Sequence, residues 1–230
     1  MSEKNIDFGK TKVETATITD SFESAIGKFR KALLAILVVF VLAVIAIVVG
    51  IIVHSNSVKS GLEKVDTVYF SLSNAKSDIS ADEVKALQDS SIETLLRLSK
   101  SSGIVGMRAS MLLGELYFQQ GKFDESRNAW LAAANFEKNS YTNSVSYYNA
   151  AACSESLNDL DSAVKYYELA SSDSDFLLVD HALFSLARVY EAKKDSAKAT
   201  ETYQKLNDLH PNSSWANLAK TRLIALKVNQ

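Results

Sequence analysis

Apolar and polar positions divide the chain into one long apolar run and a series of periodic segments. Residues 32–53 consist only of Ala, Leu, Ile, Val, Phe and one Gly. At about 1.5 Å per residue, a helix over this run is roughly 33 Å long, which is enough to cross the roughly 30 Å apolar core of a bilayer. The run therefore predicts a transmembrane helix, since buried core helices usually have apolar stretches of about 10–14 residues.

A cleaved signal peptide is the main alternative for this run. The apolar part of a signal peptide is about 7–15 residues long and is followed by a cleavage site of the small-x-small type. The present run is longer, follows 31 residues of leader, and is followed by Ser55, Asn56 and Ser57, a poor match to such a site. An uncleaved anchor is therefore the favoured interpretation.

Basic residues around the run predict its orientation. Lys28, Arg30 and Lys31 immediately precede it, whereas no Lys or Arg follows it until Lys59. Because the cytoplasmic flanks of membrane helices carry an excess of Lys and Arg, we expect the N-terminus inside the cytoplasm and the C-terminal part outside it. Residues 1–31 would then form a cytoplasmic tail that ends in a juxtamembrane helix.

Small and aromatic residues recur at regular intervals in the second half of the chain. Gly114 to Ala151 is 37 residues, and Ala151 to Ala187 is 36. We expect each unit to be a pair of antiparallel helices that approach closely at the small residues and stack on the next pair, because one hairpin cannot bury its apolar face alone. Each unit also contains a second small residue with an aromatic residue four positions later: Ser126 and Trp130, Ala163 and Tyr167, and Ala199 and Tyr203.

This pattern resembles the tetratricopeptide repeat, whose signature is W-x2-L-G-x2-Y…A-x3-F…P. The resemblance covers residues 107–211 as three units. The third unit is the best match, with Leu186-Ala187 and the terminal Pro211, and the second departs most, with Ser154 where Tyr is usual. The implied fold is all-α: a single N-terminal transmembrane helix followed by a solenoid of helical hairpins.

The resemblance also implies a concave groove that is lined by the first helices of successive units and binds a protein or peptide partner. Its apolar members would form a strip edged by mixed charge, without the cluster of Lys and Arg that clamps a C-terminal carboxylate. The alternative is that some of these side chains only contact the flanking helices. The groove-facing residues are expected to be Arg108, Met111, Glu115, Phe118 and Gln119 in the first unit, Tyr148 and Glu155 in the second, and His181, Phe184, Arg188 and Glu191 in the third.

Helical periodicity continues on both sides of the repeats. Residues 56–102 are predicted to form a degenerate hairpin whose first helix continues from the span, because only Gly61 interrupts it. Ser80 and Glu83 have the spacing of a capping box at the start of the second helix of this hairpin. Residues 212–230 are predicted to form a capping helix, since the exposed end of a solenoid needs a cover.

Composition agrees with a helical chain and excludes several classes of function. The 230 residues include 8 Gly and 1 Pro, where average usage gives roughly 16 and 12, so a turn-rich β-fold is disfavoured. The net charge of −2 gives a nucleic-acid partner no electrostatic support. The chain has 1 Cys and 3 scattered His, so we expect no metal site, and Cys153 is expected to be a small buried residue. No catalytic motif is present, so we expect no enzyme activity, no small-molecule substrate and no cofactor.

This layout leaves two hypotheses for the function. It is similar to the YfgM type of bitopic inner-membrane protein, and that resemblance implies a role beside the Sec translocon and with periplasmic chaperones. The first hypothesis is therefore a single-pass protein of the cell inner membrane whose periplasmic repeats bind exported polypeptides or a translocon or chaperone partner. The second is a structural scaffold within an envelope assembly or division complex.

Overall fold

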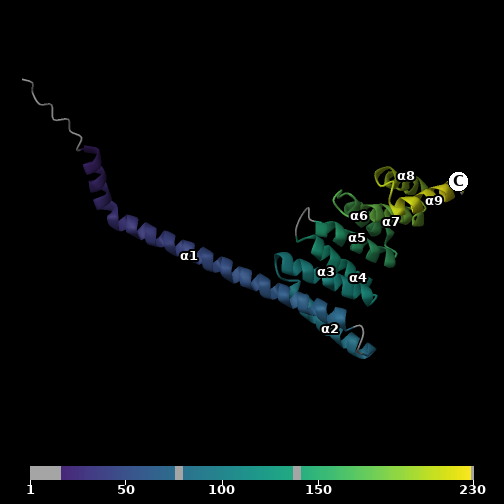
Figure 1. Cartoon of the computed structure of the whole chain (residues 1–230), viewed down its shortest axis with the longest axis horizontal. Helices are drawn as coiled ribbons and strands as arrows, with labels where there is room; N and C mark the ends of the chain where they lie inside the picture. Colours follow the sequence, from purple (N-terminus) through teal and green to yellow (C-terminus); the bar gives the residue numbers. More distant parts are fainter. Residues whose placement is uncertain (1–16, 76–79, 137–140, 229–230) are drawn as a thin grey trace, which may run out of the picture. The chain divides into compact units, whose positions relative to one another are not determined.

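The computed structural model describes residues 17–75, 80–136 and 141–228. Within these ranges every regular element is a helix, which confirms the predicted all-α class. The chain divides into two compact units, Met1–Asn56 and Ser57–Gln230. The helices are α1 (Thr17–Asn74), α2 (Ala81–Leu98), α3 (Gly103–Gln119), α4 (Phe123–Ala134), α5 (Tyr141–Ser156), α6 (Leu160–Ser171), α7 (Val179–Ala192), α8 (Ser196–Leu209) and α9 (Ser214–Val228) (Figure 1).

The first unit contains the greater part of α1. This helix begins at Thr17, so the first 16 residues of the predicted cytoplasmic tail lie outside the described residues. The side chains of residues 32–53 are exposed along the whole run. Among the described residues, α1 is the helix that is long and apolar enough to cross a membrane, and by length and composition it fits a membrane span and a signal sequence alike.

The second unit begins with the last turns of α1, which pack against α2 and α3. Gly61 permits a close approach to α3, because a Cβ at this position would lie 2.8 Å from Cγ1 of Val105. Val65 of α1, Leu95 of α2 and Leu112 of α3 lie together in one buried cluster. The capping box predicted at the start of α2 is confirmed, since both of its reciprocal hydrogen bonds are present.

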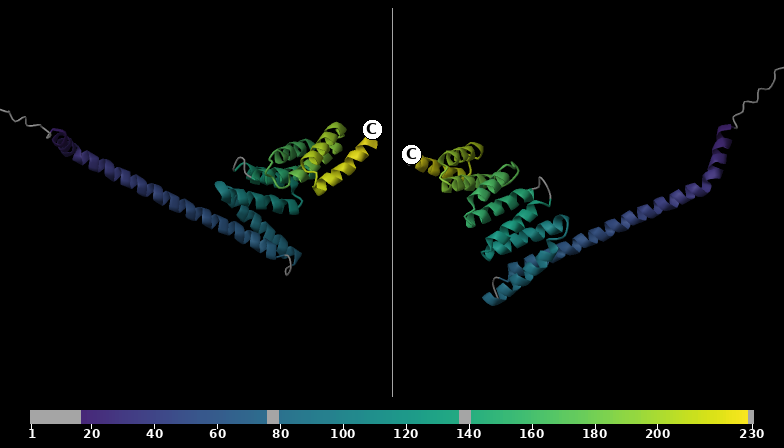
Figure 2. Two further views of the ribbon diagram at one scale, coloured as in Figure 1. Left: turned by 45° about the horizontal axis from the view of Figure 1, so that its top comes forward. Right: turned by 180° about the vertical axis from the view of Figure 1, so that it is seen from behind.

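Three helical hairpins follow in this unit, formed by α3 with α4, α5 with α6, and α7 with α8. Each second helix also packs against the first helix of the next hairpin, so the helices form a continuous stack (Figure 2). The small and aromatic residues of the repeat pattern are buried as predicted. They are Gly114, Ser126, Trp130, Ala151, Ala163, Tyr167, Ala187, Ala199 and Tyr203.

The contact between α3 and α4 shows why the pattern needs a small residue. A Cβ on Gly114 would lie 2.6 Å from Nε1 of Trp130, a distance that real Cβ contacts do not reach. On the same side of the hairpin, the Ser126 hydroxyl donates a hydrogen bond of 2.7 Å to the Gly114 carbonyl. Glycine thus allows the indole to lie against the backbone of α3, and the serine satisfies a buried backbone acceptor.

The turn inside each hairpin repeats one backbone conformation. Gly121, Asn158 and Lys194 have positive φ values of 71°, 56° and 61°. The N–H of the following residue then donates to a carbonyl near the end of the first helix, at 2.9 Å in all three turns. A residue in this left-handed backbone conformation ends the helix and reverses the chain. Gly adopts the conformation most easily, followed by Asn.

The last helix, α9, covers the third hairpin by packing against α8 and α7. Ala216 and Ala219 are completely buried there, and Leu223 packs against the same core. Leu218, which a simple apolar pattern would place inside, is 49% exposed. The buried alanines bring the α9 backbone close to α8, in the manner of the small residues within the hairpins.

We expect Gly114→Ala to destabilise the repeats, because the added methyl group overlaps the buried Trp130 indole. The expected loss is about 1–3 kcal/mol in the free energy of unfolding. The measurement is urea unfolding followed by tryptophan fluorescence, because Trp130 and Trp215 are the 2 tryptophans of the chain and both lie in the second unit. Gly27→Ala is the matched control, since nothing lies within 4 Å of a Cβ at that helical glycine. An unchanged urea midpoint for Gly114→Ala would contradict the helix packing described above.

Candidate partner-binding groove

The groove residues expected from the sequence lie on α3, α5 and α7, the first helices of the three hairpins. The structure divides them into two groups. In the second and third hairpins they bond to or stack on side chains of neighbouring helices, whereas in the first hairpin Arg108, Glu115 and Gln119 lie beside the α1–α2 hairpin. The expected groove residues of the first hairpin therefore differ in their surroundings from those of the other two.

Glu155, near the end of α5, receives hydrogen bonds from two other helices. Arg188 of α7 donates to its carboxylate, with Nη2 at 2.6 Å from Oε2. The Tyr167 hydroxyl of α6 donates to the same carboxylate at 3.3 Å. The carboxylate thus connects both helices of its own hairpin to the first helix of the next one.

The same arrangement recurs one repeat later, around Glu191 of α7. Arg222 of α9 donates from Nε to Oε1 at 3.0 Å, and the Tyr203 hydroxyl of α8 donates at 2.7 Å. Burial alone would raise the pKa of Glu191, but the bonds from Arg222 and then Tyr203 outweigh it and hold that pKa below its ordinary value. Each Glu–Tyr–Arg set is called a rung below.

Sequence reasoning placed Glu155, Arg188 and Glu191 in the groove but missed the rungs. It did not include Arg222, and it assigned the two tyrosines to packing only. A signal was present, because a Glu is followed by a Tyr twelve residues later in both repeats. A Glu–Tyr pair that recurs at equivalent positions indicates that the two side chains bond to each other across one hairpin. A Glu that faced an open groove would not need a Tyr at this spacing.

An aromatic cluster links α5, α7 and α9. The Tyr148 hydroxyl lies 3.0 Å from Nδ1 of His181, and the His181 ring is stacked on Trp215 with ring centroids 3.9 Å apart. Phe184 contacts the same indole at a centroid distance of 5.1 Å. These three expected groove residues therefore form part of the surface on which α9 packs.

The expected groove residues of the first hairpin contact side chains of α1, α4 and α5. Arg108 bonds to Asp66 of α1, with Nη2 at 2.6 Å from Oδ1. Met111 packs against the buried cluster between α4 and α5. Phe118 is 42% exposed and meets Phe123 edge-on at a centroid distance of 5.2 Å.

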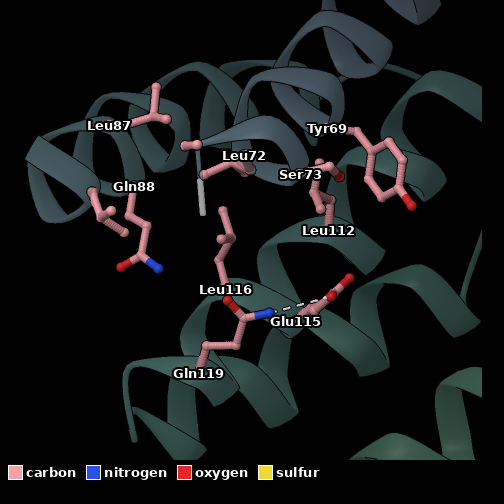
Figure 3. A pocket seen from close by; sticks show the side chains of 11 residues that line it. Tyr69, Leu72, Ser73, Leu87, Gln88, Leu112, Glu115, Leu116 and Gln119 are labelled. Atoms are coloured by element: carbon pink, nitrogen blue, oxygen red, sulfur yellow. Dashed lines mark hydrogen bonds between the residues drawn. The ribbon is translucent and has the colours of Figure 1, made fainter. Parts of the chain in front are cut away.

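Glu115 and Gln119 line a cleft between α3 and the α1–α2 hairpin (Figure 3). Leu72 and Leu116 point toward one another across it, with Gln88 on the α2 side (Figure 3). The cleft holds about 60 Å³, well below the roughly 300–1,000 Å³ of pockets that bind small molecules. Its size suits a single side chain of a partner.

The described part of the chain shows no group of three or more His, Cys, Asp or Glu residues that could hold a metal ion. Cys153 is completely buried, as predicted. Its Sγ lies 3.1 Å from the Ser126 hydroxyl, and burial raises the pKa of the thiol. A buried thiol with a raised pKa is a poor nucleophile, so Cys153 has a packing role in α5.

Models of the tetratricopeptide repeat match residues 89–141, 144–172 and 181–213. A TPR repeat-containing protein from Treponema pallidum (strain Nichols) is 30% identical over 148 residues, which make up 63% of this chain and 62% of that protein. The chain thus spans less than two thirds of the length of this curated relative. These matches and the helical hairpins show that the chain carries tetratricopeptide repeats. Arrays of this repeat are protein–protein interaction modules.

Acidification is expected to weaken the packing of α9 through His181. Burial lowers the pKa of this histidine from its ordinary value of 6.5. The unfolded chain therefore takes up the proton first, and stability falls as the pH drops below about 6.5. We expect the urea midpoint to decrease between about pH 7.5 and about pH 5.5, and to decrease less in His181→Gln. His54→Gln, outside the repeats, serves as the control, and equal decreases in wild type and His181→Gln would contradict this role.

Proposed function

We propose that this protein is a membrane-anchored interaction module of the bacterial cell envelope. Its repeats would lie in the periplasm and bind exported polypeptides or a translocon or chaperone partner. The observation that carries the proposal is the presence, in one chain, of an exposed apolar helix of span length and an array of tetratricopeptide repeats. The same layout is the basis of the resemblance to the YfgM type of inner-membrane protein.

The position of basic residues supports the proposed orientation. Lys28, Arg30 and Lys31 are exposed on α1 just before the apolar run, and positive charge next to a span favours the cytoplasmic side. A single span then places the second unit on the other side of the inner membrane. Tethering raises the effective concentration of the repeats for clients that emerge at the same membrane, without any additional contact.

A scaffold within an envelope assembly or division complex is the second candidate. The observation that favours it is the outer face of α9, where Leu218, Ile224 and Val228 are 49%, 66% and 79% exposed. A fixed subunit that covered this face would remove apolar surface from water. The two candidates differ in where the partner binds and in whether one partner or many are bound.

The topology can be tested by cysteine labelling of the full-length protein in a Cys153→Ala background. Ala197→Cys places a thiol on an exposed position of α8, and Ser2→Cys places one in the N-terminal tail. In intact spheroplasts, a membrane-impermeant maleimide is expected to label the first thiol, and to label the second only after lysis. Labelling in the opposite order, or loss of an N-terminal tag from the mature protein, would overturn the proposed anchor.

Photo-crosslinking separates the two candidate functions. A benzoylphenylalanine at Phe118 samples the groove on α3, and one at Ile224 samples the outer face of α9. Binding of exported polypeptides predicts many products from Phe118 and few from Ile224. A fixed scaffold predicts one stoichiometric product from Ile224. Tyr148 and Phe184 are less suitable positions, because their rings belong to the aromatic cluster against which α9 packs, whereas Phe118 is 42% exposed.

A further inference from the structure

The polar groups of the C-terminal half of the groove are used within the chain. The two rungs join α5, α7 and α9 through Glu155 and Glu191, and the aromatic cluster around His181 joins the same three helices. A partner that bound these side chains would have to break ion pairs and hydrogen bonds that the folded chain already has. Such exchange gains little, because one bond replaces another.

The rungs stop at the first hairpin. Phe118 stands one repeat before Glu155, because the first two units are 37 residues apart, and Ala152 stands one repeat before Arg188. The position of the carboxylate is therefore an aromatic ring on α3, and the position of the guanidinium is a methyl group on α5. The neighbouring Gln119 side chain donates to Glu115 on its own helix at 3.3 Å. The N-terminal half of the groove thus lacks the Glu–Tyr–Arg rungs that occupy the C-terminal half.

This half of the groove contains the cleft between α3 and the α1–α2 hairpin. Its walls are largely aliphatic, with Leu72 from α1, Leu87 from α2 and Leu116 from α3. Tyr69 lies at its edge and is 57% exposed (Figure 3). An apolar side chain that entered the cleft would be removed from water against these walls.

The charge at the edge of the cleft is negative. Of the 11 lining residues drawn in Figure 3, Glu115 is the charged one. Its hydrogen bond is to the neutral Gln119, while Arg108 on the same helix is paired with Asp66. The carboxylate at the edge of this apolar cleft therefore favours a cation on the partner and disfavours a carboxylate.

On these grounds, and resting on the proposed binding function, we infer that the cleft is the specificity site of the groove. Its occupant is a polypeptide segment that presents a large aliphatic side chain next to a Lys or Arg. The aliphatic group enters between Leu72 and Leu116, and the neighbouring cation meets Glu115. The aliphatic group supplies most of the affinity, and the cation supplies discrimination between otherwise similar segments.

The test uses the full-length protein in nanodiscs and fluorescein-labelled peptides of Gly, Ser and Asn that carry one central pair, Leu-Lys, Leu-Glu or Ala-Lys. Binding is measured by fluorescence anisotropy, with empty nanodiscs as the blank. We expect Leu-Lys to bind roughly tenfold more tightly than Ala-Lys, because the smaller side chain leaves the cleft unfilled. We expect it to bind about three- to fivefold more tightly than Leu-Glu, the range of a partly exposed ion pair.

Two variants assign these preferences to the cleft. Glu115→Gln keeps the shape of the side chain and is expected to remove the preference for Leu-Lys over Leu-Glu, while the preference for Leu over Ala remains. Ser73→Trp fills the cleft from the exposed side of α1 and is expected to remove the preference for Leu over Ala. Glu125→Gln removes an exposed carboxylate on α4 and is the matched control, with no expected change.

Three results would overturn the inference: equal binding of all peptides, preferences that survive both variants, or a loss that Glu125→Gln reproduces. Urea midpoints equal to that of wild type show that the variants remain folded. Failure here is distinguishable from failure of the proposed function. Crosslinking of exported polypeptides from Phe118 without any dependence on Glu115 or Ser73 would retain the binding module and reject the cleft.

Discussion

The structure depends on the close approach of helices at positions where the side chain is nearly absent. In the first hairpin the Trp130 indole lies against the backbone at Gly114, and Ser126 bonds to the carbonyl of that glycine. Alanines take the equivalent places in the other hairpins, opposite Tyr167 and Tyr203. Each hairpin thus presents a face that fits the next one, and the apolar surface of every unit is covered only because its neighbours are present.

The periodic part of this fold could be predicted from the sequence because its cause is local and repeated. Small residues at fixed spacing report the helix contacts directly, and all of those singled out are buried. The groove was harder to predict, since Glu155 or Arg188 has the same residue type whether it faces a partner or another helix. To decide whether such a side chain faces a partner or another helix, one must know which side chains about one repeat away lie next to it. Those relative positions depend on how far successive hairpins rotate, which the sequence pattern does not specify. The cleft beside Leu72 was also missed, because the α1–α2 hairpin lacks the repeat pattern that would have aligned it with α3.

The rungs show how a repeat array can use polar side chains on its inner face for cohesion. Each carboxylate accepts from a tyrosine of its own hairpin and an arginine of the next, so the bonds are made between units as well as within them. Such pairs contribute modestly when they are exposed to water, but they are specific in direction and length. Their presence in the later repeats and absence near α3 divides one continuous surface into a self-bonded part and an open part.

The end of the rungs at α3 also has a mechanical consequence. A stack of hairpins bends by small rotations at each junction, and side-chain ties between successive first helices resist those rotations. The α5–α7 and α7–α9 junctions have such ties through Glu155 and Glu191, whereas the α3–α5 junction has Phe118 and Ala152 in the corresponding places. The last two junctions are therefore tied along the first helices, whereas the first junction is tied on its other side, where Arg127 of α4 donates to Asp159 at the start of α6 at 2.8 Å.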